Sequence, residues 1–336
     1  MIVNRFVFLL LNILLVHCLV AQKTVPLYKH LKFEECKASE YISTVTYIPL
    51  ETNTECLLNE DIEIIATSQY LFVHDFKADV VFRFDIKGEF INKIGQKGQG
   101  PGEYKRLFGF YVDDISKKCF LLDSYSNRIL VYDYEGKFIQ QFSCSFAPSR
   151  MEKIGNNYIL NNESYTDTKK ELFLLDNNGK LLKQSDLKTN SRIGLSLFQP
   201  FFYKHNGHCY YKNYITDDVY HVDDKLIKNI AYQIECGNRA IDSKENQYNL
   251  EKGSLTENKI VVGAIKGYKN NLYITYATDK RCFAVYDIIS GNVFSPGENE
   301  ESGFAYSGDA RSPFPVISVH SWFYQNDSGA KLIFFS

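Results

Sequence analysis

The residues with the clearest potential for phosphate chemistry lie in the stretch IGQKGQGPGEY, residues 94–104, where four glycines and a proline fall within eight positions. Glycine-rich loops bind nucleotide phosphates when they lead from a strand into the N-terminus of a helix. A P-loop needs a lysine directly after its second conserved glycine, and Pro101 follows Gly100 here. A Gly-x-Gly-x-x-Gly loop that starts at Gly98 meets Glu103 in place of its third glycine. The segment also runs from strand to strand, so its sequence argues against a nucleotide site.

We interpret the same stretch as a structural connection between two repeated units. Proline fixes φ, and Gly102 suits the position of a type II turn that requires φ > 0. Small residues let the backbone pass close to a neighbouring unit. The residues expected to form this connection are Gly98, Gly100, Pro101, Gly102, Glu103 and Tyr104.

The histidines offer a second chemistry, metal binding. His205 and His208 form an HxxH pair, but in a glycine-containing hairpin (KHNGHC) rather than on a helix. We expect a solvated loop pair there and a hydrogen-bonded strand-end histidine at His74. Three histidines could converge on a metal ion in the central channel, but no spacing demands it. A Zn²⁺ or Ca²⁺ ion in the channel is the alternative. The sequence therefore predicts no metal ligand and no cofactor.

Carboxylates recur at one place in the repeat, since Asp75, Asp123 and Asp279 each follow a strand. We expect them to cap the turns that follow, because aspartate bonds to its own downstream backbone. A ring of carboxylates around a cation is the alternative. Arg83 and Arg128 are expected to pair with these aspartates if buried. No GxSxG or comparable nucleophile signature is present.

The elements that position these residues follow from a repeat. Three apolar strands are each followed by Asp-x-x-Gly and a second strand, and weaker copies lie at 219–230 and 283–294. Aspartate favours turns and glycine accepts φ > 0, so each mark predicts a hairpin. A further strand pair precedes every mark, which makes a unit of four strands in roughly 45 residues, typical of a propeller blade. The turn residues are Asp85 and Gly88, Asp133 and Gly136, and Asp176 and Gly179.

The predicted fold is all-β, a single six-bladed β-propeller of four-stranded antiparallel blades over residues 41–336. Five units are visible, and the sixth is assembled from C-terminal strands at 316–324 and 331–335 with an N-terminal strand at 43–49. That arrangement closes the ring with strands from both termini and removes an open sheet edge. Five or seven blades are the alternatives.

The N-terminus predicts export. Arg5 precedes an apolar run at 6–16 and a cleavage site after Ala21, so residues 1–21 read as a signal peptide and 22–40 as an N-terminal segment. The run is shorter than the roughly 20 residues of a membrane span. Lipidation at Cys18 is the alternative, although His17 stands where lipoprotein signals have a small residue. We expect no membrane span after cleavage, and a location in the periplasm or cell envelope.

The bulk composition narrows the partners. The chain has 336 residues, a net charge of −2 and 15% aromatic residues. No basic excess is present to neutralise phosphates, which argues against nucleic acid. Seven cysteines lie beyond the signal peptide at scattered spacing, which fits neither a disulfide framework nor a zinc site. We expect a monomer.

Two stretches resemble known families. Residues 95–142 resemble an NHL-type propeller repeat, through the GPGEY segment, an Asn-Arg pair and the Asp-x-x-Gly-x-Phe hairpin. Residues 47–104, with YIPLET, Cys-Leu-Leu and GQGPGEY in order, resemble the exported six-bladed β-propeller proteins of Bacteroidetes. The resemblance implies an exported envelope propeller and no particular reaction. NHL-type propellers serve as interaction platforms and, less often, as metal-dependent lyases or hydrolases.

The aromatic loops suggest where a ligand would bind. GHCYYKNY and SVHSWFYQND place aromatic rings beside polar groups, which suits stacking on sugars or contacts with peptides. Ordinary packing between blades is the alternative. The predicted function is a non-catalytic binding or scaffold propeller that engages a protein or glycan at one face; a metal-dependent hydrolase or lyase with a site at the central channel is the alternative. The candidate ligand-binding residues are Tyr210, Tyr211, Trp322 and Tyr324.

Overall fold

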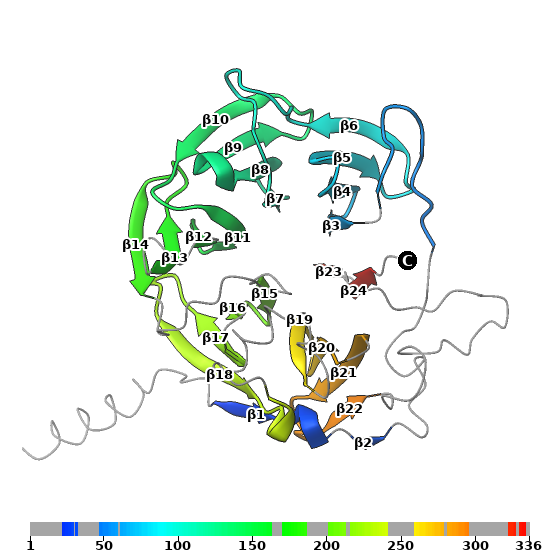
Figure 1. The fold of residues 1–336 in the computed structure, drawn as a ribbon, viewed down its shortest axis with the longest axis vertical. Coiled ribbons are helices and arrows are strands. Elements are labelled where there is room, and N and C mark those ends of the chain that lie inside the picture. The colour runs from blue at the N-terminus through cyan, green and yellow to red at the C-terminus, as the bar shows by residue number, and fades with distance from the viewer. Residues whose placement is uncertain are drawn as a thin grey trace, which may run out of the picture.

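Five antiparallel four-stranded sheets stand around a common axis like the blades of a propeller (Figure 1). The structure is a computed structural model, and it describes residues 22–29, 31–32, 47–59, 61–162, 170–186, 201–212, 216–240, 259–278, 281–295, 322–326 and 329–333. The predicted all-β propeller fold with four-stranded antiparallel blades is therefore confirmed.

Each blade is a meander whose four strands follow one another in sequence, with the first strand at the ring centre and the fourth at the rim (Figure 1). Blade 1 comprises β3 (Ile62–Ala66), β4 (Tyr70–Asp75), β5 (Val80–Asp85) and β6 (Phe90–Ile94). Blade 2 comprises β7 (Gly109–Asp113), β8 (Lys118–Asp123), β9 (Arg128–Asp133) and β10 (Phe138–Ser143). Blade 3 comprises β11 (Pro148–Ile154), β12 (Asn157–Asn162), β13 (Lys170–Leu175) and β14 (Leu181–Asp186).

The last two complete blades follow the same order. Blade 4 comprises β15 (Phe201–His205), β16 (His208–Lys212), β17 (Asp218–Val222) and β18 (Lys228–Ile234). Blade 5 comprises β19 (Val261–Tyr268), β20 (Asn271–Ala277), β21 (Arg281–Asp287) and β22 (Val293–Ser295). The short 3₁₀ helices are η1 (Leu27–Lys29), η3 (Ser124–Ser126) and η4 (Gly237–Arg239).

The predicted count of six blades is wrong for the part of the chain that the structure describes, which holds five. Between blade 5 and blade 1 there is only a two-stranded sheet, β23 (Trp322–Asn326) with β24 (Gly329–Ile333), and β23 lies against β3 (Figure 1). Of the closing strand expected at 43–49, residues 43–46 lie outside the described residues, and residues 47–49 are not in a strand. The described residues thus show no four-stranded sixth blade closed by strands from both termini.

Part of the N-terminal segment predicted at 22–40 pairs with outer strands of the propeller. β1 (Lys23–Val25) pairs in parallel with β18, and β2 (Leu31–Lys32) pairs in parallel with β22. The chain thereby covers the outer edges of blades 4 and 5, and an edge covered in this way cannot template association with another strand.

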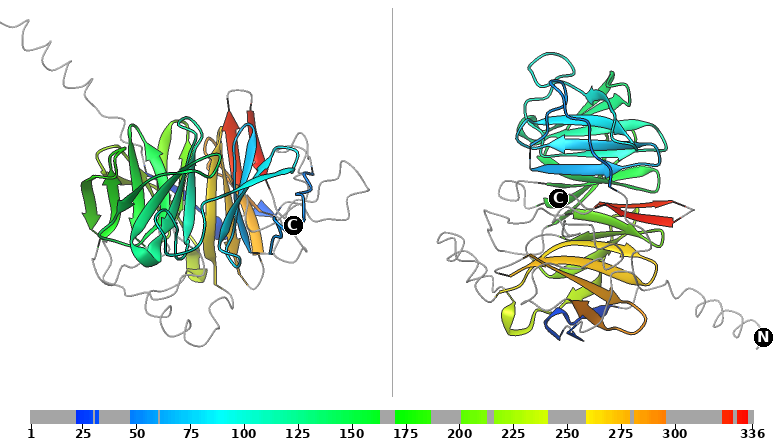
Figure 2. Two further views of the ribbon diagram at one scale, coloured as in Figure 1. Left: turned by 90° about the horizontal axis from the view of Figure 1, so that it is seen from above. Right: turned by 90° about the vertical axis from the view of Figure 1, so that its right-hand side faces the viewer.

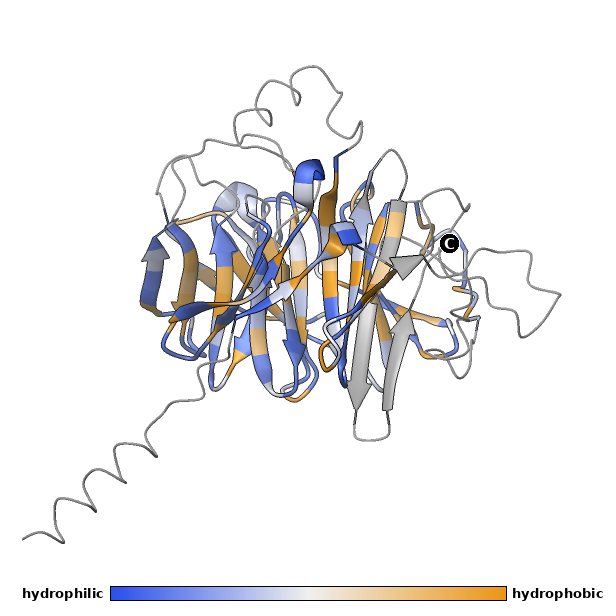
Figure 3. Cartoon of the chain, turned by 90° about the horizontal axis from the view of Figure 1, so that it is seen from below, coloured by the Kyte–Doolittle hydropathy of each residue, from blue (hydrophilic) through white to orange (hydrophobic). Residues whose placement is uncertain are grey.

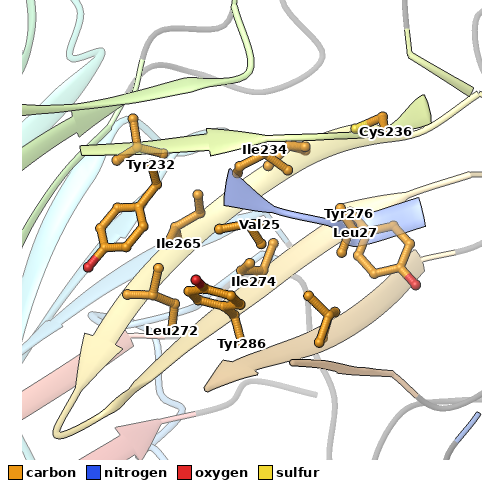
Figure 4. Packing of buried hydrophobic residues seen from close by; sticks show 14 of the residues in the cluster. Val25, Leu27, Tyr232, Ile234, Cys236, Ile265, Leu272, Ile274, Tyr276 and Tyr286 are labelled. Carbon is orange, nitrogen blue, oxygen red and sulfur yellow. The ribbon is translucent and has the colours of Figure 1, made fainter. Parts of the chain in front are cut away.

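The hydrophobic core consists of layers between neighbouring blades. Strand residues alternate between the two faces of a blade, so each sheet packs apolar residues against both neighbours. Figure 3 shows these hydrophobic residues running through the strands, and Figure 4 shows the layer between blades 4 and 5, where Val25 of β1 joins Ile265 and Ile274. Burying one such aliphatic side chain contributes about 1.5–3 kcal/mol. The six cysteines that the structure describes have free thiols, and four of them are buried.

The disc has two distinct faces, because the strands run through its thickness (Figure 2). In an up-and-down sheet, the turns after the first and third strands lie at one end, and those after the second and fourth at the other. We call the first end the turn face and the second the loop face. All ten turns of the turn face are described for the five blades, whereas the loop face carries the connections between blades.

Candidate functional site

Polar side chains from all five blades gather on the innermost strands. Each first strand carries at least one charged residue or a tyrosine whose polar group lies near those of the neighbouring first strands. We call this group the inner cluster. It comprises Glu63 of β3, Tyr111 of β7, Arg150 and Glu152 of β11, Lys204 of β15 and Lys266 of β19.

Arg150 links three blades at one level of the cluster. Its Nη1 donates to the carbonyl oxygen of Phe108 at 2.8 Å and lies 3.7 Å from Oε2 of Glu63. Gly109, on the intervening blade, makes this path open, since a Cβ atom there would lie 2.5 Å from the same Nη1. The guanidinium of blade 3 therefore crosses blade 2 to reach the carboxylate of blade 1.

Glu152 is the centre of a second level. Its Oε1 accepts from the Tyr111 hydroxyl at 3.1 Å and lies 3.0 Å from Nζ of Lys204. Burial lowers the pKa of Lys266, while the carboxylates of Glu152 and Glu63 oppose that effect. Burial also raises the pKa of Tyr111 well above its usual value, and Glu152 adds to the effect. The cluster holds three cationic and two anionic side chains, so its charge is slightly positive and largely compensated between blades.

His74 lies immediately behind the inner cluster and is fully buried. It is the cross-strand partner of Glu63, and its ring packs 4.4 Å from Phe76 and 5.9 Å from Phe110, measured between centroids. Neither ring nitrogen has a hydrogen-bond partner among the described residues. Burial lowers the pKa of His74 to about 4, although Glu63 and Asp79 favour the proton. The ring is therefore neutral at physiological pH.

The next feature is the arrangement of the side chains that could bind a metal ion. Across the described ranges, no three side chains of His, Cys, Asp or Glu come together in a geometry suited to a metal ion. Asp75 and Asp123 bind backbone groups instead: Asp75 accepts from the amides of Lys77, Ala78 and Asn59, and Asp123 accepts from those of Ser126 and Lys105. Asp279 lies outside the described residues.

The arginines expected to pair with these aspartates behave differently from each other. Arg128 Nε lies 3.1 Å from Oδ2 of Asp123. Arg83 instead lies 3.5 Å from Glu135, and its guanidinium is 4.8 Å from the centroid of Tyr70. Its pairing with an aspartate was wrong because β5 directs Arg83 toward blade 2, where aromatic rings and Glu135 surround it.

The glycine-rich loop folds onto itself at the loop face. The amide of Glu103 donates to the Gly100 carbonyl at 3.1 Å across Pro101, with Gly102 at φ +75°, which is the geometry of a type II turn. The Gly100 amide donates to the Glu103 carboxylate at 2.7 Å. A Cβ atom on Gly98 would lie 2.0 Å from the same carboxylate, so a larger residue there would have to displace the Glu103 side chain.

The same loop joins blade 1 to blade 2. The hydroxyl of Tyr104, which is fully buried, donates to the Asp79 carbonyl at 2.9 Å in the β4–β5 turn. From blade 2, Arg128 donates to the Glu103 carbonyl at 2.6 Å, and the Tyr132 hydroxyl donates to the Gly102 carbonyl. The loop's polar groups are thus engaged by protein, in a structural arrangement.

The Asp-x-x-Gly residues form one hairpin turn in each of the first three blades. The carboxylate of Asp85 accepts from the amides of Lys87 and Glu89, and equivalent bonds are made by Asp133 and Asp176. Positive φ angles occur at Gly88 (+91°), Gly136 (+81°) and Gly179 (+79°). In blade 4 the position is taken by Leu226, with φ +59°.

The structure describes the side chains of two of the four predicted ligand-binding residues. Tyr210 is 4% exposed and Tyr211 is fully buried in the layers on either side of blade 4, so neither ring is free to stack on a sugar. Trp322 and Tyr324 belong to β23, and only their backbone is described. The four residues are not brought together on an exposed surface by the described structure.

The expected HxxH pair does not form. His205 is buried, and its Nε2 lies 2.7 Å from the Lys269 carbonyl of blade 5. His208 lies instead against His221 of the next strand, with Nδ1 and Nε2 3.1 Å apart. His205 and His208 are directly opposite each other in the β15–β16 ladder and therefore lie on the same face of the blade, but the His205 ring bonds to blade 5 and the His208 ring to β17.

The turn face carries exposed aliphatic side chains from four blades. Ile115 is 89% exposed in the β7–β8 turn, and Ile289 is 76% exposed in the β21–β22 turn. Ile86 and Ile227 are each 47% exposed in the hairpins of blades 1 and 4. Large aliphatic groups at the tips of turns contribute nothing to the blade layers, and their recurrence on one face suits contact with another molecule.

Sequence reasoning missed both the inner cluster and this apolar face. In two of the first strands, IEIIA and VVGAIKGY, the signal for the cluster was a single charged residue inside an otherwise apolar strand. The signal for the face was an isoleucine one or two residues after a turn aspartate at Ile86, Ile115 and Ile289, and Ile227 has no such signal.

Comparison with known proteins places the chain in a family. The family model for a domain of unknown function, DUF4934, matches residues 22–327. The chain belongs to the DUF4934 family. No curated protein sequence matches it. In the searched part of the structure, no helix is both long and apolar enough to cross a membrane.

Solved structures share the propeller fold. The crystal structure of a "Putative exported protein" from Bacteroides fragilis is 19% identical, with a TM-score of 0.67 over 82% of this chain and 80% of that one. A DUF4221 member from Bacteroides vulgatus is 12% identical, with a TM-score of 0.48 over 74% and 83% of the two chains. A streptogramin B lyase is 12% identical, with a TM-score of 0.45 over 68% of each chain. The first likeness shows that this chain and the Bacteroides fragilis protein share a fold.

Proposed function

We propose that this DUF4934 protein is a non-catalytic binding propeller of the bacterial cell envelope, and that it engages a protein partner through its turn face. The observation that carries the proposal is the ring of exposed isoleucines, Ile86, Ile115, Ile227 and Ile289, contributed by four blades to one face. Aliphatic groups favour a protein surface over a glycan, because sugars are bound by stacking on exposed aromatic rings.

The inner cluster supports the same proposal. Its carboxylates are held by cations from other blades, with Glu63 facing Arg150 and Glu152 facing Lys204. Such pairs hold the blades in register and keep the turn face rigid. A rigid surface loses less conformational freedom on binding, which favours affinity.

Export and ring closure are part of the proposal. The family match begins at Gln22, directly after the predicted cleavage site, which supports a signal peptide at 1–21. The Lys93 carbonyl, on the outer strand of blade 1, lies beside Gly136 of blade 2. The Pro49 carbonyl lies beside Gly88 of blade 1 in the same way. This likeness supports residues 47–51 as the outer part of a sixth blade with β23 and β24. The NHL character of the repeat and a monomeric state complete the proposal.

The partner can be sought by cross-linking in envelope preparations. The double variant Ile115→Asp/Ile289→Asp adds charge to the turn face at two exposed positions. Tyr125→Asp is the matched control, because Tyr125 is 74% exposed on the loop face. We expect one protein to be cross-linked by the wild type and by the control, with roughly tenfold or greater loss of affinity in the double variant. Equal capture by all three chains, or capture lost only in the control, would refute a turn-face interaction.

A further inference from the structure

His208 and His221 form a pair that the sequence does not suggest. His208 is the first residue of β16. His221 lies in β17 directly opposite Tyr210, so the two histidines are diagonal neighbours on adjacent strands. Nδ1 of His208 and Nε2 of His221 are 3.1 Å apart, and the ring centroids are 5.0 Å apart with the planes inclined at 74°. The two rings therefore point one nitrogen each at the same small region of the turn face.

This separation fits a shared metal ion. With metal–nitrogen bonds of about 2.0–2.1 Å, two nitrogens 3.1 Å apart subtend roughly 95–102° at the ion. That angle lies between the ideal angles of octahedral and tetrahedral coordination. The nitrogens need no displacement relative to each other; the proton between them only has to move to the far nitrogen of its own ring, which leaves both imidazoles neutral.

The surroundings leave both rings accessible and favour the neutral form of His221. His208 is exposed and His221 is half-buried, with the ring of Tyr210 5.8 Å from that of His221. Burial lowers the pKa of His221, and His208 lowers it further, whereas Asp223 opposes both. One oxygen of Asp223 accepts from the amides of Lys225 and Ile227, and the carboxylate as a whole places negative charge near the pair.

We propose that His208 and His221 form an open site for one divalent transition-metal ion, Zn²⁺ or Cu²⁺. Imidazole nitrogen is the ligand type that both ions take readily. The chain supplies two ligands, and water or a group of a bound molecule completes the coordination. The site stands beside Ile227 on the turn face, but it does not depend on the proposed partner.

The test is a metal titration of the purified chain without a histidine tag. Isothermal calorimetry with zinc chloride and with copper chloride should show one ion bound per chain. His208→Ala and His221→Ala should each weaken metal binding by about tenfold or more. Loss of a residue that only supports a metal ligand already lowers metal affinity by about tenfold. His205→Gln is the control, because the ring of His205 is buried and already bonded to a carbonyl oxygen; its affinity should be unchanged.

Electron paramagnetic resonance supplies a readout that a merely structural role would not change. The Cu²⁺ spectrum of the wild type should show coupling to two imidazole nitrogens, and each alanine variant should show one. The proposal is wrong if no ion binds, if both alanine variants bind as tightly as the wild type, or if the copper spectrum is the same in all of them. If the wild type binds the metal ion but captures no partner, the proposed function is wrong and the metal site stands.

Discussion

Gly136 and Gly291 lie in the outer hairpins of blades 2 and 5, where the blade 5 turn is one residue longer; both have positive φ, +81° and +73°, but their surroundings differ. A Cβ atom on Gly136 would lie 2.5 Å from the Lys93 carbonyl oxygen of the preceding blade, whereas one on Gly291 would meet nothing within 4 Å. Replacement by alanine therefore separates two effects, the strain of a positive φ and the exclusion of a close inter-blade contact.

The expected magnitudes follow from these distances. The left-handed conformation costs an alanine about 1–2 kcal/mol, of which roughly 0.4–1 kcal/mol is recovered through the less flexible unfolded chain. Gly291→Ala should thus lower the free energy of unfolding by about 1 kcal/mol. Gly136→Ala adds an overlap with backbone atoms, which typically costs a further 1–3 kcal/mol, so its total should be about 2–4 kcal/mol.

Equilibrium unfolding in urea, followed by circular dichroism, measures both values. The wild type and the two variants are compared at one temperature and one pH, and the slope of the transition should be the same in all three. If Gly291→Ala proves as destabilising as Gly136→Ala, the contact between the hairpin of one blade and the outer strand of the previous one does not constrain the sequence, and our account of the Asp-x-x-Gly turns is wrong.

Two further predictions concern buried polar groups. Burial holds the pKa of His74 at about 4 against a usual 6.5. Between these pH values the unfolded chain takes up a proton at His74 and the folded chain does not. The free energy of unfolding should therefore be highest above pH 6.5 and fall by about 3 kcal/mol as the pH decreases to 4. His74→Leu, which copies Leu122 at the same position of blade 2, should flatten the decline between pH 6.5 and 4 in urea titrations, and an unchanged slope would show that His74 is not its source. Tyr104→Phe removes the buried hydroxyl that donates to the Asp79 carbonyl and should lower stability by about 1–3 kcal/mol, seen as a lower midpoint of thermal unfolding; an unchanged midpoint would mean that water replaces the bond.

The parts of the fold that are encoded locally were within reach of the sequence. An aspartate that caps its own turn and a glycine that accepts positive φ act within four residues, so the hairpins at Asp85–Gly88 and Asp133–Gly136 can be located without a partner segment. Leu226 shows the limit of that reasoning, since it takes the glycine position at φ +59° while its side chain is buried. There the packing gained by a leucine outweighs the strain of its backbone.

Long-range contacts were out of reach. Arg150 meets Glu63 across an intervening blade, and His208 meets His221 rather than the His205 that lies nearest to it in sequence. Neither pairing is written in any local spacing, because which strand faces which depends on how whole blades are set around the axis.

The sequence by itself determined the four-stranded unit, its turns and the general fold, because strand alternation and turn chemistry operate over a few residues. Only the tertiary structure decided how many complete blades the described chain forms, that β1 and β2 cover the outer edges of blades 4 and 5, and that one face collects the exposed isoleucines. The physical reason is that these properties arise when strands more than a hundred residues apart come to share one ring, and the free energy of that arrangement lies in contacts between blades.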